Sequence, residues 1–186
     1  MFPSLARPAG LAAALLLAAL PASGATSLYS DLYGKQCRTV ETDPGSGATS
    51  RLCKGVGGYS LLVHEARGQT SVDIVTSGGA VYSLDYWEVV TPGLSRVGRK
   101  AEWRVEKRAG RVVPTALLVR LDITNEQTQG PRVAPGMLLA AARIDTDGAC
   151  VVYQGDGNGK GSDDAARKAV ALQGSKCLGV VMAQTR

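Results

Sequence analysis

The amino-acid sequence predicts an α+β domain, built mainly from an antiparallel β-sheet with one C-terminal helix packed on it and two disulfide bonds. Three observations predict this class. Segments rich in strand-forming residues, with rough alternation of apolar and polar side chains, follow one another from residue 58 to residue 154. A helical pattern occurs only after them. The four cysteines form an even set in a chain that begins like an exported protein.

The first 25 residues have the three parts of a cleavable signal peptide. Arg7 supplies the basic end, Leu11–Leu20 is an uncharged apolar core, and small residues surround Gly24 and Ala25. The apolar core has about half of the roughly 20 residues that a bilayer requires, so we expect no stable membrane insertion. We predict cleavage near Gly24 or Ala25, a periplasmic or secreted location, and a single globular domain over residues 26–186.

The cysteine positions suggest a disulfide pairing. Cys37 and Cys53 lie symmetrically about Gly45, within a turn-rich stretch, so a hairpin centred there would place the two sulfur atoms opposite each other. Cys150 would then pair with Cys177 by elimination.

The strands are expected to be joined largely by hairpins. They are predicted at residues 58–66, 70–76, 80–90, 100–107, 112–123, 137–144 and 149–154. Gly68-Gln69 fits a two-residue type II′ turn, and the resulting register places His64 opposite Asp73. Asp147-Gly148 is the strongest hairpin signal in the chain.

The glycine-rich stretch Gly155–Gly161 is expected to be a linker. It lacks the Ser or Thr that ends a phosphate-binding loop, and a calcium ion there would meet Lys160 and Arg167. A zinc site needs closely spaced cysteine pairs, which are missing from the sequence. We therefore predict no cofactor and no metal site. After the linker, Ser162 is expected to cap a helix that ends at Gly174.

His64 facing Asp73 resembles part of a catalytic triad. In the expected register Ser60 and Ser71 are both too far from His64 to hand over a proton, so a structural pair is favoured and no catalytic residue is assigned. Paired carboxylates for glycoside cleavage are the other catalytic hypothesis. The residues that could supply them are Glu65, Asp73, Asp85 and Glu88.

The net charge of +5 has a local source between residues 96 and 111. This stretch predicts either a surface for an anionic partner or a solvated strand face. A nucleic-acid partner is not expected, because export takes the protein out of the compartment that contains nucleic acid. The candidate partner-binding residues are Arg99, Lys100, Trp103, Arg104, Lys107, Arg108 and Arg111. A strand tryptophan such as Trp87 or Trp103 is more often core than a platform for a sugar or a partner protein.

Several segments resemble those of a group of small exported bacterial proteins with no assigned activity. The resemblance lies in Cys53–Gly58, Gly58–Arg67, Ala101–Arg104, Gly110-Arg111, Ala149–Val152 and the alanine-rich helix before Cys177. It implies an exported domain and assigns no active-site residues.

The leading functional hypothesis is an exported, non-catalytic binding or inhibitor-type module. Its partner would be another protein or an anionic envelope component. The alternatives are a small cell-wall hydrolase that uses paired carboxylates or His64, and a structural envelope protein.

Overall fold

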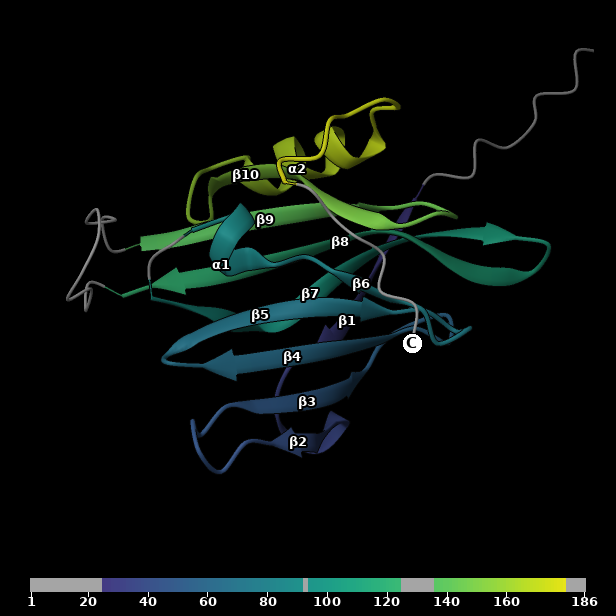
Figure 1. The fold of residues 1–186 in the computed structure, drawn as a ribbon. Coiled ribbons are helices and arrows are strands. Elements are labelled where there is room, and N and C mark those ends of the chain that lie inside the picture. The colour runs from purple at the N-terminus through teal and green to yellow at the C-terminus, as the bar shows by residue number, and fades with distance from the viewer. Residues whose placement is uncertain (1–24, 92–93, 125–135, 180–186) are drawn as a thin grey trace, which may run out of the picture.

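The computed structural model describes residues 25–91, 94–124 and 136–179, and shows two antiparallel sheets of five strands each (Figure 1). The signal-peptide prediction for residues 1–24 falls outside the described residues. Sheet A has the order β1 (Thr26–Asp31), β7 (Ser95–Arg108), β8 (Arg111–Ile123), β9 (Gly136–Ile144) and β10 (Ala149–Asp156). Sheet B has the order β2 (Cys37–Thr42), β3 (Thr49–Lys54), β4 (Ser60–Ala66), β5 (Gln69–Val75) and β6 (Val81–Ser83).

The main hydrophobic core lies where side chains of both sheets meet. Alternate residues of the central strands point into it, as the period of two in a β-strand requires. Fully buried members include Leu61, Val72, Trp103, Leu117 and Leu121. The prediction of a mainly antiparallel β protein is confirmed, but the expected single sheet is wrong. In the described part of the chain, ten strands form two layers, so that both sheets can bury one apolar face.

The predicted C-terminal helix is present as α2 (Ser162–Ala171) and covers the outer face of sheet A (Figure 1). Ala166 and Val170 form a smaller core with apolar residues of β8 and β9. The capping prediction is wrong: the N-cap is Gly161, and the Ser162 hydroxyl donates to the carbonyl of Gly159. The described residues contain no helix that is long and apolar enough to cross a membrane.

Both predicted disulfides are present, Cys37–Cys53 and Cys150–Cys177. Cys37 lies directly opposite Cys53 in the β2–β3 hairpin, as the symmetric spacing predicted. The second disulfide fastens the segment after α2 to β10. Beside it, the Leu178 amide donates to the Val151 carbonyl.

Two local predictions are corrected by the backbone. The β4–β5 turn is formed by Arg67 and Gly68, both at positive φ, and this shifts the register by two residues. The expected strand over residues 80–90 ends early, because Asp85 adopts a left-handed conformation and starts the short helix α1 (Tyr86–Val89). Tyr86 stays buried in spite of this change.

Candidate functional site

The basic residues predicted to bind a partner do not form one surface. Lys107, Arg108 and Arg111 lie at the exposed tip of the β7–β8 hairpin, where Arg108 pairs with Glu106 at 2.8 Å. Lys100 lies about seven residues away on the same strand, which is roughly 23 Å at about 3.3 Å per residue. The dense run of charge in the sequence is therefore spread along a long hairpin.

The prediction that Trp103 binds a partner is wrong. Its side chain is completely buried between the sheets, and its indole N–H donates to Ser30 Oγ at 2.9 Å. Tyr59 packs edge-on against it, with ring centroids 6.2 Å apart. Trp103 is thus a core residue, as strand tryptophans usually are.

Arg104 belongs to a network that holds α2 on sheet A, because its guanidinium donates to Ser27 Oγ and lies 3.8 Å from Glu102 Oε1. The centre of the network is Glu102, which is buried and accepts two hydrogen bonds of 2.8 Å from Arg167 of α2. Ser27 Oγ donates to the same carboxylate at 2.6 Å. Burial alone would raise the pKa of Glu102, but the hydrogen bonds from Arg167 and Ser27 outweigh burial and leave the pKa below its ordinary value.

A different set of cations surrounds a surface pocket beside the Cys37–Cys53 disulfide. We call it the basic pocket and define it by Lys35, Arg38, Lys54, Gln36, Leu52 and Ser60; it has a volume of about 280 Å³. Lys35 lies in the 3₁₀ helix η1 (Gly34–Gln36), and Arg38 begins the exposed part of β2. Cys53 points into the core, so Leu52 and Lys54 must point to the outer face of sheet B.

The strand register gathers these side chains on one face. Arg38 pairs with Leu52, and Lys54 pairs with Ser60 at the start of β4. Leu52 therefore forms an apolar floor between Arg38 and Lys54. The hydroxyl of Ser60 lies beside them.

The charge of the basic pocket is not neutralised by neighbouring carboxylates. Lys35, Arg38 and Lys54 form no ion pair with any carboxylate of the described residues, unlike Arg51, Arg104 and Arg167. Some other described cations, such as Lys107 and Arg111, also form none, but they do not line this pocket. No acidic residue lines the pocket. Three cations with a hydroxyl and an amide are the donors that phosphate, sulfate and carboxylate groups require.

Sequence reasoning missed Lys35, Arg38 and Lys54, although a signal for them existed. The predicted pairing of Cys37 with Cys53 already places Arg38 and Lys54 next to the same disulfide, one on each strand. In the sequence they are isolated cations, whereas seven basic residues lie between residues 96 and 111.

His64 contacts Asp73, but not in the register that was predicted. Asp73 lies opposite Leu62, and the contact runs diagonally, with His64 Nε2 2.8 Å from Asp73 Oδ2. Ser50 Oγ lies 3.0 Å from His64 Nδ1, and the Ser83 hydroxyl donates to Asp73 Oδ1 at 2.9 Å. A chain of hydrogen bonds thus crosses β3, β4, β5 and β6 on the outer face of sheet B.

This chain of hydrogen bonds contains the residue types of a Ser-His-Asp triad, but it lacks the surroundings that a catalytic triad needs. Ser50 is buried, in the middle of a strand that is paired on both sides. A nucleophilic serine needs an accessible oxygen and donors for the oxyanion, and paired strands use their backbone N–H groups on each other. The arrangement therefore fits a structural role for Ser50 better than a nucleophilic one.

The four carboxylates proposed for glycoside cleavage do not form one site. Glu65 pairs with Arg51 at 3.1 Å, on the strand face opposite to that of Asp73. Asp85 precedes α1, and burial, followed by the charges of Glu88 and Asp73, raises its pKa.

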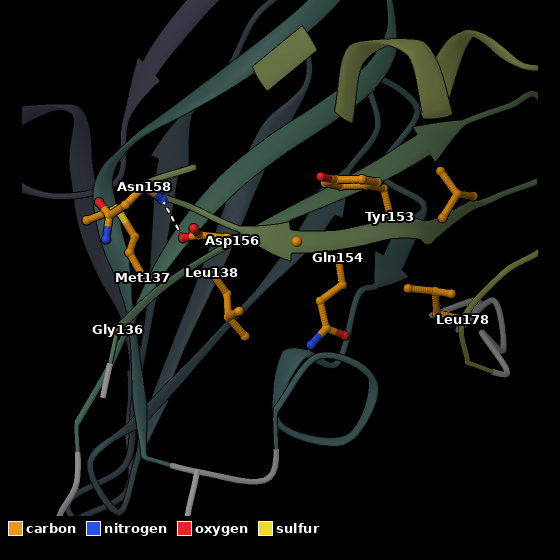
Figure 2. A pocket seen from close by; sticks show the side chains of 10 residues that line it. Gly136, Met137, Leu138, Tyr153, Gln154, Asp156, Asn158 and Leu178 are labelled. Atoms are coloured by element: carbon orange, nitrogen blue, oxygen red, sulfur yellow. Dashed lines mark hydrogen bonds between the residues drawn. The ribbon is translucent and has the colours of Figure 1, made fainter. Parts of the chain in front are cut away.

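A surface hollow of about 860 Å³ forms an open groove along β9 and β10 (Figure 2). Gln154 and Leu178 lie along it, and at its other end Asp156 accepts a hydrogen bond from the backbone N–H of Asn158. Much of its wall is apolar. Within the described residues, no group of three or more His, Cys, Asp or Glu side chains is arranged to hold a metal ion.

Comparisons of the chain with protein-family models, with curated proteins and with solved structures found no match.

Proposed function

We propose that this protein is an exported, non-catalytic binding module whose basic pocket holds an anionic group of an envelope component. The observation that supports it most is the set Lys35, Arg38 and Lys54. These three cations share one pocket and have no carboxylate partner among the described residues. Unpaired cations in one hollow attract phosphate, sulfate or carboxylate more strongly than cations that already have partners.

The segment that leads into η1 lies next to two residues of the predicted partner-binding set, Arg99 and Lys100. The Leu32 amide donates to the Arg99 carbonyl at 2.9 Å, and Asp31 lies opposite Lys100. Lys100 is already paired with Asp31 at 4.0 Å. The charge that supports the proposal is therefore that of Lys35, Arg38 and Lys54.

Export is part of the proposal. Two disulfides in a chain of this length are typical of proteins from oxidising compartments. The predicted signal peptide accounts for delivery to such a compartment.

The test compares two triple variants with the same loss of charge. The oxidised protein from residue 25 onward is titrated by calorimetry with short-chain polyphosphate at about 50 and 150 mM salt. Lys35→Ala/Arg38→Ala/Lys54→Ala is expected to bind at least about tenfold more weakly, which is about 1.4 kcal/mol. The control, Lys107→Ala/Arg108→Ala/Arg111→Ala, is expected to change affinity less than about threefold.

Equal losses in the two variants would mean that only net charge matters, and would refute a specific pocket. A larger loss in the hairpin-tip variant would move the site to the β7–β8 turn.

A small cell-wall hydrolase is the second candidate, because Ser50, His64 and Asp73 are in hydrogen-bond contact. Release of soluble fragments from purified cell wall by the wild-type protein, lost in His64→Ala, would support it. Fragment release that His64→Ala does not affect would exclude His64 as its base.

A further inference from the structure

A second pocket lies at the other end of sheet B, between the β4–β5 turn and α1. It has a volume of about 480 Å³ and is lined by Ser46, Ala66, Arg67, Gln69, Trp87 and Glu88. Strand β4 runs from Ser60 at the basic pocket to Ala66 here, so the two pockets are roughly 20 Å apart at about 3.3 Å per residue. The volume is within the range of sites for small organic ligands.

The backbone on both sides of this pocket is held in an uncommon conformation. Arg67 has φ 51° and Asp85 has φ 41°, and both are in the left-handed region that favours glycine. The β4–β5 turn accounts for Arg67. Asp85 lies at the junction where β6 ends and α1 begins, and strained residues of this kind cluster at functional sites.

An unusual carboxylate lies next to the aromatic side chain in the sequence. Asp85 precedes Trp87 by two residues, and its Oδ1 atom is buried without a hydrogen-bond partner among the described residues. Trp87 itself is half-buried and borders the pocket, so part of its ring is available to a ligand.

The lining has the composition of a sugar site. A tryptophan offers a flat apolar surface to the C–H face of a pyranose, and flanking polar groups bind its hydroxyls. Glu88 accepts hydrogen bonds, Arg67 donates them, and Ser46 does both. The opposite charges of Arg67 and Glu88 favour a neutral ligand over an anion or a cation.

We propose that this pocket binds a neutral saccharide, with one pyranose ring stacked on Trp87. The inference does not depend on the proposed anion site, because the two pockets share no residue.

The chain contains only two tryptophans, which makes the test selective. Trp103 is fully buried, so any change of tryptophan fluorescence caused by a ligand at the surface belongs to Trp87. The oxidised protein from residue 25 onward is titrated with chitotriose, cellotriose and maltotriose. A saturable change in fluorescence is expected with at least one of them. Failure of all three to produce one up to about 10 mM would overturn the proposal.

Two variants locate the site. Trp87→Phe should abolish the fluorescence response and weaken calorimetric binding at least fivefold, while the retained Trp103 signal reports that the protein is folded. Glu88→Gln, at an exposed position, should weaken binding at least threefold without affecting the fold. Unchanged affinity in both variants would overturn the proposal. Lys35→Ala/Arg38→Ala/Lys54→Ala should bind the sugar like wild type, so failure of one site is distinguishable from failure of the other.

Discussion

Replacing Arg167 with alanine should loosen α2 from sheet A. Arg167 donates two hydrogen bonds of 2.8 Å to Glu102, whose side chain is only 8% exposed. Removing one partner of a buried ion pair costs about 3–5 kcal/mol, because the other charge stays buried. Ser27 and the Arg104 guanidinium, 3.8 Å away, still face Glu102. We therefore expect the lower end, about 3 kcal/mol, or roughly 6–12 °C in Tm for a domain of this size.

The measurement is thermal and urea unfolding of the oxidised protein, with Arg120→Ala as the matched control. Arg120 also pairs with a carboxylate of α2, that of Asp163, but both side chains are about 40% exposed. Exposed pairs contribute about 0–1 kcal/mol, so this control should stay within about 1 kcal/mol of wild type. The comparison separates the effect of burial from the effect of simply removing an arginine beside α2.

The pH dependence supplies an independent check. The folded-state pKa of Glu102 lies below its ordinary value of 4.5, so the pair stabilises the fold above about pH 4.5 and its contribution is lost as pH falls through the folded-state pKa. The gap between wild type and Arg167→Ala should therefore be full at pH 7 and shrink below about pH 4. Equal stability of Arg167→Ala and Arg120→Ala, or a gap that stays constant down to pH 3, would refute the reasoning.

Three further predictions concern the two disulfides and His64. Replacing Cys37 and Cys53 with serine should lower the free energy of unfolding by about 3 kcal/mol, as expected for a disulfide that closes a loop with a 16-residue separation. It should also weaken polyphosphate binding, because this disulfide anchors the basic pocket. Replacing Cys150 and Cys177 with serine should lower the free energy of unfolding by about 3.5 kcal/mol, because their separation is 27 residues, and should leave polyphosphate binding unchanged. Thermal unfolding checks the stability of both disulfide variants, and calorimetry checks their binding. His64→Ala should lower the free energy of unfolding by about 1–3 kcal/mol, because Asp73 loses a hydrogen bond, and should not alter polyphosphate affinity; a loss of affinity would place His64 in the binding site.

The parts of the fold that were predictable are those set by local sequence. The β2–β3 hairpin follows from turn residues between two cysteines, and α2 follows from its helical pattern after a glycine-rich stretch. The β4–β5 register was missed by two residues, because Arg67 adopts a positive φ that sequence rules reserve for glycine. A shift of two preserves the strand faces, so His64 still contacts Asp73.

The parts that were not predictable depend on long-range pairing. Strand β1 is mostly exposed and shows little alternation, and it exists as a strand because it pairs with β7, about 70 to 80 residues away. The division into two sheets depends on the same kind of contact. Neither β6 nor α1 indicates by itself that the next strand joins a different sheet.

The contrast between the predicted basic cluster and the basic pocket has a physical reason. Neighbours along a β-strand point to opposite faces and advance by about 3.3 Å per residue, so a run of charges in sequence is divided between two faces and stretched along the strand. In β7 this sends Trp103 into the core and Arg104 toward α2. Residues on adjacent strands, in contrast, are within about 5 Å of each other when their register matches. Arg38 and Lys54 share a pocket for that reason, and Lys35 joins them because η1 leads directly into Cys37. In a β protein, a site for an anion is therefore better sought from predicted cross-strand partners, here through the cysteine pair, than from charge density along the chain.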